Sequence, residues 1–218
     1  MVAPIEPREP RLWRLHSDAT NRAFLVRALA GRRYESALKT DLFDEAVTTG
    51  VAPLLRDHAR SIAGIDLSSD VVALAGERHP EIDARRADVR DLPFGDATFD
   101  LVVSLSTLDH LASVAEIGAA IGGLGRVLAP GGTLALTIDN LANPVVAARN
   151  ALPGAALREA GLVAYRVGPT VGPRRLERSP LQHGRFLRAA RAFEALEALP
   201  TRYLTGYFVA IVAERPLT

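Results

Sequence analysis

Acidic and polar side chains follow three apolar runs of the chain, at the points where buried strands would end. Asp66 ends the run 61–66 and Asp88 ends the run 83–88. The third run, 99–105, leads into a polar stretch over 104–110. In an open α/β sheet, ligands bind beyond the carboxyl ends of the strands, and an acidic residue ending the second strand can accept hydrogen bonds from both hydroxyls of a ribose. A strand-terminal aspartate can also simply cap the next helix. Asp66 therefore predicts either a ribose site or a helix cap.

The polar stretch also holds the best candidates for acid–base chemistry. Asp109 and His110 lie just past the third run, where either could take a proton from a bound acceptor. His110 could equally cap the following turn or face solvent. Asp139 and Asn140, after the run 133–138, could contact an acceptor or merely turn the chain. No metal site is predicted, because the remaining histidines show no metal-ligand spacing; they are His16, His58, His79 and His183.

The elements that must position these residues alternate between strand and helix. Expected strands cover residues 37–43, 61–66, 83–88, 99–105, 133–138 and 203–213, and expected helices cover 45–60, 69–78, 113–128 and 185–199. Such alternation predicts an α/β fold with a Rossmann-like, doubly wound, mostly parallel sheet and helices on both faces. The last strand is expected as an antiparallel edge.

The domain organisation follows from the same pattern. Residues 1–36 contain an amphipathic stretch that we expect to form a helical lid or flank, and residues 37–218 form the main domain. Within it, residues 141–184 are interrupted by proline and glycine and are predicted to be a substrate-side insertion over the acceptor site.

Composition narrows the class of protein. The 218 residues carry a net charge of +1 and no cysteine, so disulfides, thiol catalysis and cysteine zinc sites are excluded. Residues 1–15 lack the apolar core of a signal peptide and no run is long enough to span a membrane, so a cytoplasmic location is expected. Residues 166–191 hold an arginine excess that could bind an anion, but a solvated basic face is the plainer interpretation and nucleic acid is not predicted as a partner.

Four motifs stand in a recognisable order between residues 37 and 140. They are Gly64–Ser68, Ala87–Phe94, Phe99–Ser104 and Arg126–Gly132. Together they resemble the class I S-adenosylmethionine-dependent methyltransferases, of the kind called type 11-like. The resemblance implies a seven-stranded sheet, S-adenosylmethionine as cofactor and S-adenosylhomocysteine as product.

The resemblance also implies roles for residues in these motifs. Asp66 would hold the ribose hydroxyls, with Leu67 in the same cofactor site. Asp88 would accept a hydrogen bond from the adenine amino group, with the Val89 amide beside it. Ser104 would lie near the methionine end of the cofactor.

The first motif departs from the family, which has an acidic strand end followed by a Gly-x-Gly-x-Gly loop that lets the backbone approach the cofactor. The stretch 38–50 has one glycine, and two alignments are open. Either Asp44 is the acidic residue, with Ala46, Thr48 and Gly50 in the glycine places, or Thr40–Asp41–Leu42 forms the loop. The second agrees better with the apolar pattern, and the stretch is similar to a variant bacterial branch of the superfamily.

Lys39 is the single lysine of the chain and lies in the first expected strand. A buried ammonium needs a partner, so Lys39 should reach a carboxylate or the mouth of the site. It could form a structural ion pair with Asp41 or Asp44, or it could lie beside the methionine moiety of the cofactor together with the Thr40–Asp41 turn.

These observations predict an enzyme that transfers a methyl group from S-adenosylmethionine to a small metabolite or natural-product intermediate. Two alternatives stay open: a protein of the same fold that uses the cofactor for other chemistry, and a binding subunit that no longer holds the cofactor. A small-molecule acceptor is the expected partner, a membrane is not, and a homo-oligomer is left open.

Overall fold

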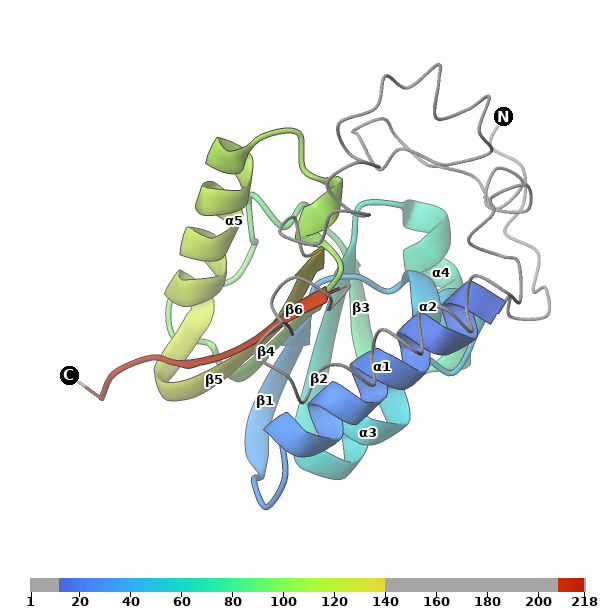
Figure 1. Cartoon of the computed structure of the whole chain (residues 1–218), viewed down its shortest axis with the longest axis horizontal. Coiled ribbons are helices and arrows are strands. Elements are labelled where there is room, and N and C mark those ends of the chain that lie inside the picture. Colours follow the sequence, from blue (N-terminus) through green and yellow to red (C-terminus); the bar gives the residue numbers. More distant parts are fainter. Residues whose placement is uncertain (1–11, 140–207, 218) are drawn as a thin grey trace, which may run out of the picture.

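The structure is a computed structural model of the chain, and it describes residues 12–139 and 208–217. Its centre is a six-stranded sheet in the order β3-β2-β1-β4-β5-β6 (Figure 1). The strands are β1 (Tyr34–Lys39), β2 (Ala59–Asp66), β3 (Ile82–Arg86), β4 (Phe99–Leu105), β5 (Leu128–Asp139) and β6 (Phe208–Glu214). The first five are parallel and β6 is antiparallel to β5, as predicted for the last strand.

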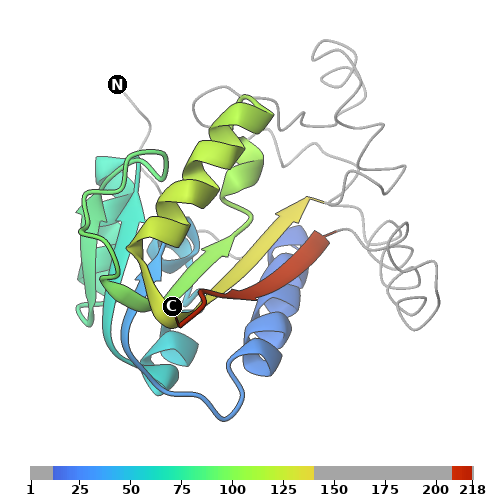
Figure 2. The same ribbon diagram turned by 90° about the vertical axis from the view of Figure 1, so that its left-hand side faces the viewer.

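Helices cover both faces of the sheet. They are α1 (Leu12–Ala28), α2 (Phe43–Val47), α3 (Ala52–His58), α4 (Ser69–Arg78), the 3-10 turn η1 (Leu108–His110) and α5 (Val114–Val127). Figures 1 and 2 show α1 and α5 on opposite faces. On the α1 face, Leu25 and Leu29 pack in one core with side chains of α3 and α4. On the other face, Leu124 of α5 packs against β4 and β5 in a second core. The predicted α/β architecture is confirmed.

The strand number is a correction. The described residues form six strands, not the seven that the resemblance implies. The structure places β6 directly beside β5, and within the described ranges no further strand pairs with β6.

The first strand and helix also differ from the prediction. β1 ends at Lys39, four residues early, because the Asp41 carboxylate accepts a hydrogen bond from Phe43 N (2.9 Å) and turns the chain. The expected helix 45–60 is two short helices, α2 and α3, separated by a turn in which Gly50 has a φ of 53°. A proline in the first turn of α3 marks the new start.

Several predictions fall outside the described residues. They concern Asn140, the substrate-side insertion 141–184, the basic stretch 166–191, the helix 185–199 and the first part of the strand 203–213. Among the helices of the described residues, none is long and apolar enough to cross a membrane.

Candidate functional site

The strand order reverses between β1 and β4, whose carboxyl ends lie side by side. Lys39 pairs with Val103 at this edge, and Thr40 N donates a hydrogen bond to the Val103 carbonyl (3.1 Å). Such a reversal is where open α/β sheets bind ligands. The turn 40–42 and the segment 104–107 therefore form the two lips of the candidate site.

Three hydroxyl groups join these lips. Thr40 Oγ1 donates to Ser104 Oγ (2.9 Å) and lies 3.1 Å from Thr107 Oγ1. Ser104 is fully buried, so its hydroxyl lies against Thr40 and is not accessible from solvent. The structure thus brings together two residues predicted for the cofactor site, Thr40 and Ser104, and adds Thr107.

Asp66 ends β2 next to this turn. Its carboxylate accepts hydrogen bonds from Ser68 N (2.8 Å) and from Leu42 N (3.2 Å). The side chain that caps α4 is Ser68, which accepts from Val71 N, so Asp66 is not the helix cap. Burial and the charge of Asp41 raise the pKa of the Asp66 carboxyl above its usual value, despite the two backbone amides. The site therefore holds a partly buried carboxylate that joins the β1 and β2 turns.

Leu42 and Leu67, the two leucines next to Asp66, differ in burial. The Leu42 side chain is fully buried and packs so closely on Gly64 that a Cβ there would meet its Cδ2 at 2.6 Å. Leu42 can therefore reach a ligand only through its backbone. Leu67 is 61% exposed, which leaves an apolar surface beside the Asp66 carboxylate.

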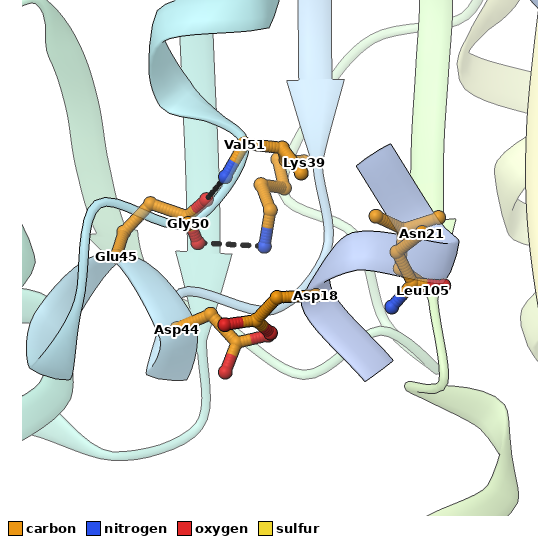
Figure 3. Close-up of a pocket in the computed structure, with 8 residues that line it drawn as sticks. All are labelled: Asp18, Asn21, Lys39, Asp44, Glu45, Gly50, Val51 and Leu105. Carbon is orange, nitrogen blue, oxygen red and sulfur yellow. Dashed lines mark hydrogen bonds and ion pairs between the residues drawn. The ribbon is translucent and has the colours of Figure 1, made fainter. Parts of the chain in front are cut away.

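Lys39 forms a buried ion pair, but not with the expected partner. Its Nζ lies 2.7 Å from Glu45 Oε2, and the two side chains are 4% and 0% exposed (Figure 3). Nζ also donates to the carbonyl of Asp41, and Glu45 Oε1 accepts from Val51 N (2.9 Å). Burial lowers the pKa of the Lys39 ammonium, but the charges of Glu45, Asp41 and Asp44 outweigh it and the pKa stays above its usual value.

A pocket opens beside this ion pair, between α1, the end of β1 and α2 (Figure 3). The backbone of Gly50 packs closely against the Glu45 carboxylate of this pair. A Cβ at position 50 would meet Glu45 Oε1 at 2.2 Å, so only glycine fits there. Sequence reasoning missed Glu45, whose burial depends on this turn. The residues that line the pocket are Asp18, Asn21, Lys39, Asp44, Glu45, Gly50, Val51 and Leu105.

Asp88 lies farther along the same edge of the sheet, after β3. Arg90 binds both of its carboxylate oxygens, at 2.6 Å for the closest pair, and also reaches Glu116 of α5 at 3.2 Å. The Arg90 guanidinium holds the pKa of the Asp88 carboxyl below its usual value. Val89 packs in the α5-side core, so its amide rather than its side chain is available to a ligand.

We expect Asp88→Ala to weaken binding of S-adenosylhomocysteine by about 10-fold, less than loss of Asp66 would, because one hydrogen bond is lost and the apolar surroundings remain. Calorimetric titration measures this. Arg90→Ala is the matched variant, since it leaves the Asp88 carboxylate but removes its partner. An effect of Asp88→Ala larger than that of Asp66→Ala would contradict the adenine assignment.

Asp109 and His110 lie in η1, the turn that follows β4. Asp109 is half-buried and His110 is exposed. Their place past the end of β4 agrees with the sequence, and a role as general base stays a prediction. Among residues 12–139 and 208–217, no group of three or more metal-ligating side chains could hold a metal ion.

A mostly parallel sheet with polar groups gathered at its strand-order reversal defines an α/β protein of the Rossmann-like kind. A family model described as a methyltransferase domain matches residues 43–136. A probable S-adenosylmethionine-dependent methyltransferase of Mycolicibacterium smegmatis is 34% identical over 89 residues, which are 41% of this chain and 34% of that protein. Residues 43–136 thus match a methyltransferase domain, and the similarities support a relation of this part of the chain to the class I S-adenosylmethionine-dependent methyltransferase superfamily.

Two further similarities bear on the acceptor and on the fold. The dTDP-3-amino-3,6-dideoxy-alpha-D-glucopyranose N,N-dimethyltransferase of Streptomyces fradiae is 30% identical over 120 residues, 55% of this chain and 45% of that protein. The cyclase SpnF shares the fold with a TM-score of 0.56 and 17% identity, over 98% of this chain and 85% of that one. The chain thus spans less than half the length of the two curated relatives described here.

Proposed function

We propose that the protein transfers a methyl group from S-adenosylmethionine to a small-molecule acceptor. The observation that carries the proposal is the Asp66 carboxylate at the end of β2, partly buried and tied to the turn 40–42 at the strand-order reversal. A small acceptor is supported by the relatives, which include two amino-sugar N,N-dimethyltransferases. Location in the cytoplasm stays a prediction.

The residues present fit this cofactor. In the proposal, Asp66 accepts the ribose hydroxyls, exposed Leu67 packs on the adenosine, and Asp88 with the Val89 amide accepts and donates at the adenine edge. The turn Thr40–Asp41–Leu42, which Lys39 holds through the Asp41 carbonyl, takes the place of the glycine-rich loop. The bound cofactor supplies an electrophilic methyl group.

The protein's own contribution is to hold the acceptor in line and, where the acceptor is protonated, to remove its proton. Asp109 and His110 are the proposed bases, because η1 places them directly past the end of β4. An amine acceptor that is already neutral would need neither residue. A role as a base therefore predicts that His110→Ala lowers turnover without changing the affinity for S-adenosylhomocysteine.

The test is transfer of isotope-labelled methyl groups from S-adenosylmethionine to a panel of small amines and alcohols, with nucleotide-linked amino sugars among them. We expect labelled product with at least one amine. The cyclase SpnF has the same fold, so the fold alone does not fix the reaction. Cofactor binding without transfer to any acceptor would favour other chemistry on the bound cofactor.

A further inference from the structure

The carboxylate proposed to bind adenine is occupied by a side chain of the protein itself. Asp88 Oδ1 accepts hydrogen bonds from Arg90 N and Arg90 Nε, both at 2.9 Å. Asp88 Oδ2 accepts from Arg90 Nη2 at 2.6 Å and lies 3.1 Å from Nε. An ionised carboxylate has about four lone-pair sites, and these contacts use them. An adenine amino group can therefore donate to Asp88 only if the Arg90 side chain leaves it.

The pair between Asp88 and Arg90 is exposed enough to be broken by a ligand. The Arg90 side chain is 42% exposed and that of Asp88 is 28% exposed. Ion pairs that reach the surface in this way contribute little to stability, because water screens both charges. Separating the two side chains therefore costs the fold little.

Glu116 offers the displaced guanidinium a second partner. Its Oε1 lies 3.2 Å from Arg90 Nη1. Its Oε2 accepts a hydrogen bond from Ala112 N (2.7 Å), and its backbone N–H donates to the Ser113 hydroxyl (3.2 Å), so the carboxylate is fixed at the start of α5. Arg90 can thus release Asp88 and stay paired with Glu116.

We propose that Arg90 competes with the adenine amino group for the Asp88 carboxylate and so sets how strongly the site prefers adenine. This inference rests on the proposed function, and it concerns a residue to which the resemblance assigns no role. When the base binds, Asp88 exchanges its charge-assisted contacts with the guanidinium for a hydrogen bond from a neutral amino group. The cofactor is therefore held less tightly than Asp88 alone would allow, and release of S-adenosylhomocysteine is favoured.

A double-mutant cycle of Asp88 and Arg90 tests the competition. Arg90→Ala should strengthen binding of S-adenosylhomocysteine by about 2- to 5-fold, because the competing group is lost. The same substitution made together with Asp88→Ala should have no effect relative to Asp88→Ala alone, because no carboxylate is left to compete for. Calorimetric titration of the parent and the three variants measures this. A merely structural Arg90 would weaken binding or leave it unchanged in both backgrounds.

Arg85→Ala is the matched control for Arg90→Ala. Arg85 pairs with Asp83 at the same spacing of two residues, with Nε 3.0 Å from Asp83 Oδ2, and both side chains are more than half exposed on β3. Removal of this pair should leave the affinity within about twofold of the parent. A gain equal to that of Arg90→Ala would mean that loss of any nearby arginine strengthens binding, and would contradict the inference.

Adenosine and purine riboside isolate the amino group, because they differ only in its presence. Their affinities are measured by competition against S-adenosylhomocysteine. We expect Arg90→Ala to strengthen binding of adenosine and to leave purine riboside unchanged. Affinity of Arg90→Ala for S-adenosylhomocysteine equal to or below that of a binding-competent parent would overturn the inference alone. A parent chain that binds no S-adenosylhomocysteine would overturn the proposed function as well.

Discussion

Replacing Asp66 with alanine should abolish most of the affinity for S-adenosylhomocysteine while the chain stays folded. The carboxylate would give up two charge-assisted hydrogen bonds to the ribose, worth ~1.5–3 kcal/mol each, so we expect a loss of at least about 100-fold. The same substitution frees Leu42 N, which loosens the turn 40–42. Calorimetric titration gives the affinity, and circular dichroism checks the fold.

Asp70→Ala is the matched control for this variant. Asp70 is an exposed carboxylate in the first turn of α4, four residues from Asp66. Its removal should leave the affinity within about twofold of the parent, the range expected of exposed positions outside a site. Equal affinities for Asp66→Ala and the parent would show that the ribose assignment is wrong.

The raised pKa of Asp66 adds a pH dependence to the same prediction. Because burial and Asp41 raise this pKa, the carboxylate begins to protonate at a higher pH than an exposed aspartate would. Protonation removes the charge that strengthens the ribose hydrogen bonds, so affinity should fall as the pH is lowered below neutrality. The residual affinity of Asp66→Ala should show a weaker dependence over the same range.

The second large effect concerns the ion pair between Lys39 and Glu45. Lys39→Met leaves the Glu45 carboxylate fully buried without its counter-charge, and breaking such a pair from one side costs about 3–5 kcal/mol. For a domain of this size we expect the thermal midpoint to fall by roughly 10 °C or more. Thermal unfolding followed by circular dichroism measures this.

The double variant Lys39→Met with Glu45→Met separates stability from binding. Apolar pairs of similar volume often replace a buried ion pair without loss, so the double variant should recover most of the thermal midpoint. It still lacks the Nζ that holds the Asp41 carbonyl, and we expect its affinity for S-adenosylhomocysteine to stay below that of the parent. A stable double variant with parent-like affinity would show that the pair is structural only.

An exposed ion pair supplies the control for this cycle. Arg60 and Glu35 lie 3.4 Å apart with side chains 82% and 79% exposed. Pairs of this kind contribute little to stability, so Arg60→Met should hardly move the thermal midpoint. A shift as large as that of Lys39→Met would mean that burial is not the cause of the effect.

The architecture could be predicted because it depends on local patterns. The continuous apolar run of β4 and the capped start of α4 each identify an element without knowledge of its neighbours. Asp66 could be placed at the carboxyl edge for the same reason. The turn after β1 was harder, since Leu42 and Phe43 extend the apolar run of the strand although Asp41 ends it.

Both alignments of the glycine-poor motif stay predictions. The first needs an acidic residue at the end of the strand, whereas β1 ends at Lys39 and its acidic candidate, Asp44, lies in helix α2. The partner of Lys39 could not be found locally, because Glu45 becomes buried only when the Gly50 turn folds Val51 back over it.

The central claim is that this glycine-poor site still binds the cofactor of its superfamily. Calorimetric titration of the parent chain with S-adenosylmethionine and S-adenosylhomocysteine tests it most directly. The account predicts saturable binding of both compounds at a single site, lost in Asp66→Ala and kept in Asp70→Ala. Binding of neither compound by the folded chain would contradict it, and would favour the alternative of a binding subunit that no longer holds the cofactor.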